Sequence, residues 1–137
     1  MNEILLEKAG MLLNECAVCS VASVTAEGYP RVCALLRIKN DGIKAVYFAT
    51  STTSTKVNQF KANSKAGVAF YNDNDSVTLL GNMSILSDSA EKDALWADWM
   101  LEYFPNGGKT DPEYTVIKFE PNEASIYIGD EYKTIKI

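Results

Sequence analysis

The chain of 137 residues contains no histidine. It therefore has no Ser-His-Asp or Cys-His catalytic pair, and no imidazole ligand for zinc, haem or non-haem iron. Proton transfer near neutral pH must then come from a shifted carboxylate, a tyrosine, a cysteine, solvent or a bound cofactor. A cofactor with its own proton and electron chemistry is the simplest of these sources. No side chain is predicted as a catalytic acid or base.

Positive charge and long apolar runs are also scarce. The chain carries 13 basic against 18 acidic residues, for a net charge of −5, so attraction to nucleic acid or to an anionic membrane is not expected. No apolar run approaches the roughly 20 residues of a membrane span, and the first ten residues carry charges in place of a signal-peptide core. Since 47% of the residues are hydrophobic, the chain can bury one core. We therefore expect a single cytoplasmic domain of residues 1–137, with no nucleic-acid or membrane partner.

Cysteine occurs three times, at Cys16, Cys19 and Cys33. The first two match the C-x-x-C spacing of redox and zinc sites, but a zinc site would need further ligands, and redox C-x-x-C motifs begin helices. The segment CAVCSVASVT is β-branched and alternating, as in a strand, where residues three apart point to opposite faces. We predict reduced thiols that pack in the structure, without a disulfide or a metal.

Most of the chain has the pattern of β-strands separated by turn signals. An amphipathic helix over 2–15 precedes them, and Asn40-Asp41-Gly42 and Pro121-Asn122 mark two of the turns. Gly81, inside the longest strand, indicates a bulge or a close approach by another backbone or a ligand. Antiparallel strands in this number favour closure into a small barrel, which removes exposed edges. The expected strands are 17–24, 31–38, 43–50, 66–71, 77–86, 114–119 and 125–128.

A further helix is predicted to begin at Asp88 and to end near Pro105. Asp88 followed by Glu91 resembles a capping box. The apolar residues that follow then fall on one helical face, where packing is a commoner role than ring stacking. These residues are Leu95, Trp96, Trp99, Met100 and Tyr103.

The hydroxyl-rich turn over 50–55 leads directly into a helix that carries Lys56 in its first turn. The first amides of a helix have no intrahelical partner and lie at the positive end of its dipole. Short hydroxyl side chains and a lysine around those amides can hold a phosphate. The alternative is a simple N-cap, with Ser54 capping a short helix whose Val57 and Phe60 pack inward. No P-loop or Rossmann glycine motif is present.

Taken together, these segments resemble the FMN-binding split-barrel proteins related to pyridoxamine 5′-phosphate oxidase, particularly the short general-stress-protein-like members. The likeness covers nearly the whole chain through SVASVTAEGYPRV, VYFATSTTSTKVNQFKANSKAGVAFYN, VTLLGNMSIL, LWADWMLEYFPNGG and DPEY. It implies a mainly β (α+β) fold, an antiparallel six-to-seven-stranded split β-barrel with flanking helices. In that family, the segment equivalent to YFATSTTSTK carries the flavin site.

The resemblance implies cofactor-binding roles for nine residues. The ribityl phosphate of FMN would be held by Thr50, Ser54, Thr55 and Lys56. The isoalloxazine would be lined by Ala34, Leu35 and Leu36, with Ala49 beside the ring. Ser76 matches a residue that reaches the flavin from the second subunit, so a homodimer with two interfacial sites is expected and one chain makes half a site.

The sequence departs from the family pattern at two positions. A common arginine after the G-x-P glycine is replaced by Cys33, and the phosphate-binding arginine of S-R-K is replaced by Thr55. Weaker phosphate binding is expected unless Arg31 or Arg37 compensates. The C-terminal extension that handles pyridoxal phosphate in the oxidase itself is lacking, so vitamin B6 oxidation is not predicted.

The leading functional hypothesis is an FMN-dependent oxidoreductase with a small-molecule electron donor and acceptor and an undetermined substrate. The alternatives are a non-catalytic flavin-binding or flavin-storage stress module, and a structural dimer whose flavin site has decayed. Split barrels also bind deazaflavin or haem. Haem would lack a histidine ligand here, and an extended basic groove for a polyanionic deazaflavin tail is missing.

Overall fold

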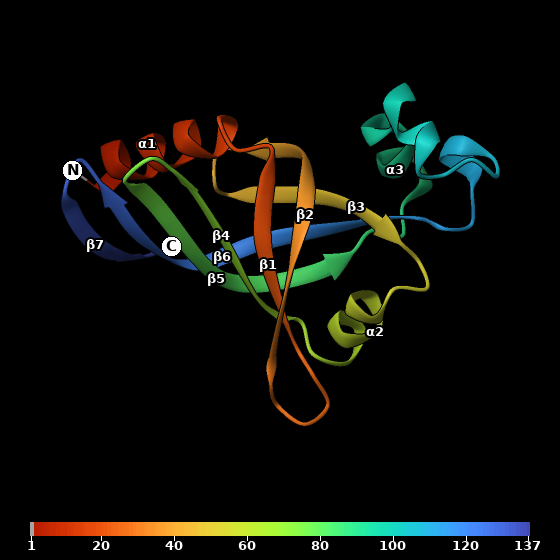
Figure 1. The fold of residues 1–137 in the computed structure, drawn as a ribbon, viewed down its shortest axis with the longest axis horizontal. Helices are drawn as coiled ribbons and strands as arrows, with labels where there is room; N and C mark the ends of the chain where they lie inside the picture. The colour runs from red at the N-terminus through yellow and green to blue at the C-terminus, as the bar shows by residue number, and fades with distance from the viewer. Residues whose placement is uncertain (1) are drawn as a thin grey trace.

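The alternating apolar residues of the chain form seven antiparallel strands, described for residues 2–137 by a computed structural model (Figure 1). The strands are β1 (Val18–Val24), β2 (Pro30–Asp41), β3 (Ala45–Ser51), β4 (Lys65–Asn72), β5 (Asp75–Ile85), β6 (Tyr114–Ile128) and β7 (Glu131–Lys136). The helices are α1 (Asn2–Asn14), α2 (Thr55–Ala62) and α3 (Ser89–Leu95), with 3-10 turns η1 (Asp98–Glu102) and η2 (Gly108–Thr110). Within residues 2–137, no helix is long and apolar enough to span a membrane.

The sheet closes on itself, which confirms the predicted antiparallel barrel with flanking helices. The strand order is β3-β2-β1-β4-β5-β6-β7, and β3 also pairs with β6 from Val46 opposite Phe119 to Ser51 opposite Tyr114. Six strands therefore form the barrel, and β7 extends the sheet from β6. Closure pairs backbone groups that an open sheet would leave exposed at its edges.

The barrel interior holds the main core, because alternate residues of each strand point inward. Its largest fully buried side chains include Phe48, Phe119 and Leu79. Helix α1 adds Leu12 and Leu13 to this core, while α2 adds Phe60 and contacts β1 and β5. Figure 1 shows α1 at one end of the molecule and α3 with its neighbouring 3-10 turns at the other.

Residues 114–119 and 125–128 belong to one strand, so the prediction of a turn at Pro121-Asn122 was wrong. Pro121 pairs with Gly81, and Asn122 is the extra residue of a bulge. A Cβ atom on Gly81 would lie 2.1 Å from the Glu120 carbonyl oxygen. The bulge and the close backbone approach predicted for Gly81 are both confirmed. Proline is tolerated there because a bulge interrupts the ladder of hydrogen bonds. Strand β7 was not predicted, since its only buried residue is Ile135.

The predicted helix from Asp88 to near Pro105 is broken in the structure. Asp88 does cap α3, because its Oδ1 accepts a hydrogen bond of 2.9 Å from the Ala90 amide. The helix then ends at Leu95, and Trp96 has an extended backbone conformation. Trp96 packs edge-on against Tyr114, with ring centroids 5.2 Å apart. Tertiary packing of this ring outweighs the local helical pattern, so the expected single apolar face does not form.

The cysteines are free thiols, as predicted, but their geometry differs from the expectation. Cys16 precedes β1, so the rule of opposite faces does not apply, and both Cys16 and Cys19 are buried. The Cys16 thiol donates a 3.3 Å hydrogen bond to the Tyr71 carbonyl. Burial raises the pKa of both thiols, that of Cys19 to about 11. Cys33 is half-buried against the main core.

Candidate functional site

A pocket forms where β2 and β3 separate. The two strands pair from Asp41 opposite Ala45 as far as Arg37 opposite Phe48, with a bulge at Ile38. Beyond that point, the Pro30–Leu36 part of β2 pairs with β1, and the Ala49–Ser51 part of β3 pairs with β6. The facing edges of β2 and β3 thus have no strand between them, and the opening holds a pocket of about 290 Å³.

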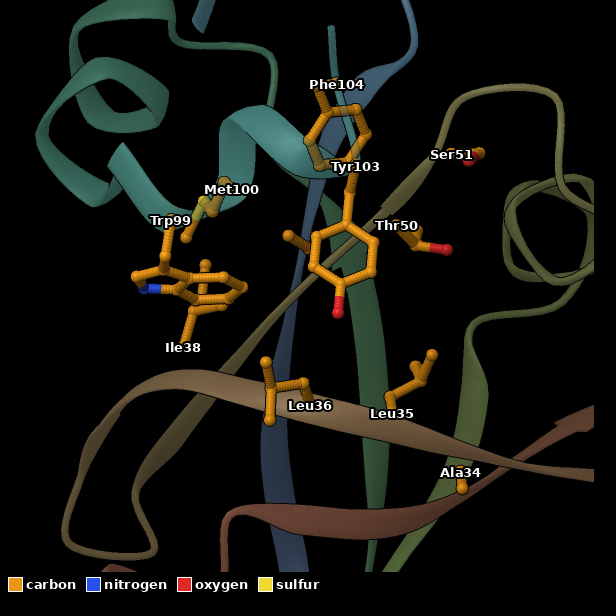
Figure 2. A pocket seen from close by; sticks show the side chains of 11 residues that line it. Ala34, Leu35, Leu36, Ile38, Thr50, Ser51, Trp99, Met100, Tyr103 and Phe104 are labelled. Atoms are coloured by element: carbon orange, nitrogen blue, oxygen red, sulfur yellow. The ribbon is translucent and has the colours of Figure 1, made fainter. Parts of the chain in front are cut away.

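Three segments line this pocket (Figure 2). The segment from η1 to Phe104 packs on the outer face of β3 and β6, because Met100 and Phe104 join a second apolar cluster with Tyr114 and Val116. Burial, and to a smaller extent Asp93, raises the pKa of Tyr114 to about 12, so this phenol stays protonated in the cluster. The pocket-lining residues are Ala34, Leu35, Leu36 and Ile38 of β2, Ala49, Thr50 and Ser51 of β3, and Trp99, Met100, Tyr103 and Phe104.

Five of the nine predicted cofactor residues lie in this pocket, namely Ala34, Leu35, Leu36, Ala49 and Thr50. The wall from Trp99 to Phe104 was not predicted as part of the site. The spacing of its aromatic residues was visible in the sequence, but it was interpreted as a packing face. That interpretation is correct for Trp96 and wrong for Trp99, whose residue surface is 47% exposed.

Lys56 links the pocket to the first turn of α2. Its Nζ donates a 3.2 Å hydrogen bond to the Oγ1 of Thr50, a pocket residue. Helix α2 begins at Thr55, whose side chain is exposed. Val57 and Phe60 are buried, as the sequence predicted. Of the predicted phosphate-binding residues, Thr50 lines the pocket and Lys56 contacts it through Thr50. Ser54 and Thr55 do not line it, and Thr55 lines a separate hollow beside α2.

Ser54 occupies the N-cap position of α2 without acting as a cap. Its backbone is extended and its side chain makes no capping hydrogen bond, so the simple N-cap interpretation is wrong. Within residues 2–137, the buried Oγ of Ser54 has no hydrogen-bond partner. Buried polar atoms are normally satisfied, and an orphan requires a reason such as an absent ligand. The Ser54 hydroxyl and the amides of the first turn of α2 are suited to an anion.

Two other hydroxyls of the turn are already engaged. Thr52 Oγ1 donates a 2.7 Å hydrogen bond to the Pro112 carbonyl. Thr53 Oγ1 donates a 3.0 Å hydrogen bond to the Glu113 carboxylate. These contacts fasten the turn to the segment before β6. They hold the backbone of the turn in place, while the Lys56 ammonium reaches the pocket residue Thr50.

The remaining candidates lie elsewhere. Ser76 is exposed at the start of β5 and does not line the pocket of this chain. The Arg37 guanidinium donates to the Asn14 and Cys16 carbonyls and to Asn40 Oδ1. Its contacts tie the end of α1 to β2. Arg31 is exposed in the part of β2 next to the β1–β2 turn.

The closed barrel with an opening between two strands defines a split-barrel protein. The model of the pyridoxamine 5′-phosphate oxidase family matches residues 5–127. A Clostridium acetobutylicum protein related to general stress protein 26, of the pyridoxinephosphate oxidase family, is 33% identical; the alignment covers 100% of this chain and 97% of that chain, with a TM-score of 0.87. The chain therefore belongs to the pyridoxamine 5′-phosphate oxidase family.

More distant structures share the fold. General stress protein 26 of Bacillus anthracis is 20% identical over 97% of this chain and 98% of that chain, with a TM-score of 0.80. A pyridoxamine 5′-phosphate oxidase-related, FMN binding protein of Nostoc punctiforme is 16% identical over 99% of this chain and 94% of that chain, with a TM-score of 0.68. No curated protein matches the chain significantly.

Proposed function

We propose that the protein binds FMN and serves as an FMN-dependent oxidoreductase. The observation that carries this proposal is the buried Oγ of Ser54 at the start of α2, which has no hydrogen-bond partner among the described residues. Lys56, two residues further along, is bonded to the pocket residue Thr50. Membership of the family and the FMN-binding description of the Nostoc relative support the same cofactor.

The phosphate of FMN would be held by Ser54, Thr55 and Lys56 at the first turn of α2, with Thr50 adjoining. The Lys56 ammonium has three donors, of which the hydrogen bond to Thr50 uses one. The remaining donors, the Ser54 hydroxyl and the free amides of the helix start can serve phosphate oxygens. Because Arg37 is engaged elsewhere, Lys56 is the principal charge for this role.

The isoalloxazine would lie against Ala34, Leu35, Leu36 and Ala49, where the unpaired edges of β2 and β3 provide backbone donors and acceptors. The flavin supplies hydride and electron transfer when it is bound. Apart from Tyr103, the pocket lining contains no titratable side chain. The chain would therefore contribute phosphate binding, orientation and the exclusion of water from the ring, which Ile38, Met100 and Phe104 favour.

The proposal includes a homodimer that completes each site. A pocket of about 290 Å³ is at the lower limit of typical ligand pockets, as expected for half a site. The outer face of the sheet formed by β2, β1, β4 and β5 exposes large apolar residues between small ones. One row of paired residues crosses the four strands through Val32, Ala22, Gly67 and Leu80. Ala34, Leu36 and Ser76 lie on the same face, so a second copy seated there would bring Ser76 toward the partner's pocket.

A cytoplasmic location is also part of the proposal, since three free thiols are typical of a reducing compartment. A non-catalytic flavin-binding module is the second candidate function. It is favoured by the scarcity of titratable groups in the pocket lining, where Tyr103 alone could exchange a proton with a ligand.

FMN titration and anaerobic reduction test the proposal. Purified protein should bind FMN stoichiometrically and shift the visible flavin spectrum, whereas riboflavin, which lacks the phosphate, should bind more weakly. Reduction of bound flavin by NADH or NADPH, followed by reoxidation with an added acceptor, supports the oxidoreductase. FMN binding without reduction by either nucleotide supports the non-catalytic module. Absence of FMN binding at micromolar protein would overturn both.

A further inference from the structure

Two large aromatic side chains are exposed at the mouth of the pocket, although the residues that follow them in the sequence are buried. Trp99 is 47% exposed and Tyr103 is 65% exposed, whereas Met100 and Phe104 are 2% and 5% exposed. The two buried residues anchor the segment on β3 and β6. Trp99 and Tyr103 are therefore held in place by a segment whose other side chains, Met100 and Phe104, are packed in the second apolar cluster.

The aromatic pair faces β2 across the opening. Figure 2 shows Trp99 and Tyr103 projecting from the helical segment toward Leu36 and Leu35. The two rings meet edge to face, with centroids 6.2 Å apart. One aromatic wall and one aliphatic wall thus bound the mouth, and flat apolar molecules suit such a space.

The lining of the pocket carries no charged side chain, and the residues next to the aromatic pair in the sequence are acidic. Asp98 and Glu102 precede Trp99 and Tyr103 in the sequence, and both are exposed. Lys56 reaches the pocket from the start of α2, where its Nζ is bonded to Thr50. With the isoalloxazine against Leu35 and Leu36, a molecule that enters on the side of Trp99 and Tyr103 meets apolar surface and a phenol, and no cationic side chain lines the pocket.

From these observations we propose that Trp99 and Tyr103 form the recognition wall for the molecule that exchanges electrons with the cofactor, and that they select uncharged planar aromatic compounds. This inference rests on the proposed function for the role of that molecule. The site for the planar aromatic compound, called the ring site below, consists of Trp99, Tyr103 and their neighbours in this chain. The pair determines specificity by stacking and by excluding charge, while Ser54 and Lys56 serve the cofactor phosphate.

Equilibrium dialysis with 2-naphthol and naphthalene-2-sulfonate tests the selection, because the two probes share a planar two-ring system and differ in charge. Neither probe is a redox partner or a thiol reagent. FMN-loaded protein should bind 2-naphthol about tenfold more tightly than the sulfonate. Trp99→Ala and Tyr103→Ala should each weaken 2-naphthol binding by about three- to tenfold. FMN binding should weaken by less than this, because the phosphate contacts at the start of α2 are unchanged.

Leu101→Ala is the matched control. Leu101 lies on the same 3-10 turn and is also exposed, but it does not line this pocket. Its replacement should leave both binding constants unchanged. The Trp96→Phe variant leaves Trp99 as the only tryptophan, so quenching of its fluorescence by 2-naphthol should locate the probe beside that residue.

Each contrary result has a distinct meaning. Loss of FMN binding in Trp99→Ala would assign the pair to the cofactor site and overturn the inference while the proposed function stands. Equal binding of the two probes, or no effect of either substitution, would also overturn it. A change of dimer mass in Trp99→Ala would show that a second copy covers the pair and would likewise overturn the inference. If the wild type fails to bind FMN, the proposed function fails, and the same dialysis on cofactor-free protein still tests the ring site.

Discussion

Lys56 and Thr50 are joined by a hydrogen bond of 3.2 Å from the Lys56 Nζ to the Thr50 Oγ1. The bond closes the hydroxyl-rich turn between the end of β3 and the first turn of α2. It holds the ammonium group of a first-turn residue of α2 against a residue that lines the pocket. The first prediction follows from this position.

Replacing Lys56 with alanine should weaken FMN binding by roughly 1.5–3 kcal/mol, the range of a hydrogen bond to a charged group. The fold should change little, because the lost contact is one hydrogen bond between side chains. Isothermal titration with FMN measures the effect. Lys61→Ala, on the last turn of the same helix, is the control and should leave the affinity unchanged. An unaltered FMN affinity in Lys56→Ala would remove Lys56 from the site.

Ser54→Ala should have opposite effects on the cofactor-free and the loaded protein. Without FMN, the substitution removes a buried hydroxyl that has no partner in the part of the chain that the structure describes, so the free energy of unfolding should stay constant or rise by about 1 kcal/mol. FMN binding should weaken, because the same hydroxyl is a phosphate donor. Urea denaturation and FMN titration measure the two effects. Thr53→Ala, which breaks the contact to Glu113, should not stabilise the protein. Loss of stability together with unchanged FMN affinity in Ser54→Ala would contradict the assignment.

Gly81→Ala should destabilise the barrel by about 1–3 kcal/mol or more, as expected for overpacking. The added Cβ would lie 2.1 Å from the Glu120 carbonyl oxygen, so the bulge between β5 and β6 must shift. Gly67→Ala is the comparison, because the nearest heavy atoms to its Cβ, apart from those of its chain neighbours, would lie 3.7 Å away. Since Gly67 lies on the proposed dimer face, the two variants are compared after light scattering has shown equal masses. Chemical denaturation of both variants gives the difference. Equal stabilities would show that the bulge adapts freely.

Light scattering at micromolar concentration should give the mass of a dimer. The interface of that dimer should bury at least about 1,200 Å². Leu80→Glu places a charge in the uncharged outer face of β5 and should shift the mass toward a monomer and weaken FMN binding together. Ile4→Glu, an equally exposed apolar position on α1, should leave the mass unchanged. A monomeric wild type, with and without FMN, would refute the proposed assembly.

The buried Cys19 thiol should make the protein less stable at alkaline pH. Burial raises its pKa from the ordinary value of 9.0 to about 11 in the folded state. Between these values the unfolded chain releases the proton while the folded chain retains it, so the free energy of unfolding falls as pH rises from 9 to about 11. Below pH 9 this group adds no pH dependence. Denaturation curves measured at a series of pH values give the free energy of unfolding. Its dependence on pH should differ between the wild type and Cys19→Ala only in that window. A thiol reagent at neutral pH should modify Cys19 only after unfolding.

The sequence alone determined the character of the fold, because its signals are properties of neighbouring residues. Alternation of apolar and polar residues located β1 to β5 within a few positions. The Asp88 cap and the start of α2 were also predictable, since a helix start depends on a few adjacent side chains. The phosphate-binding candidates followed from the same local chemistry at Ser54 and Lys56.

Tertiary structure decided what those residues can do. Whether Pro121 begins a turn or sits in a bulge depended on Gly81, forty residues away in the sequence. Helix α3 ends at Leu95, and Trp96 packs against Tyr114. Trp99 therefore lines the pocket and does not pack in the core. The pocket itself exists because β2 and β3 pair over only part of their lengths and then join different neighbours. Strand pairing of this kind is set by contacts across the whole barrel, which no local pattern of residues encodes.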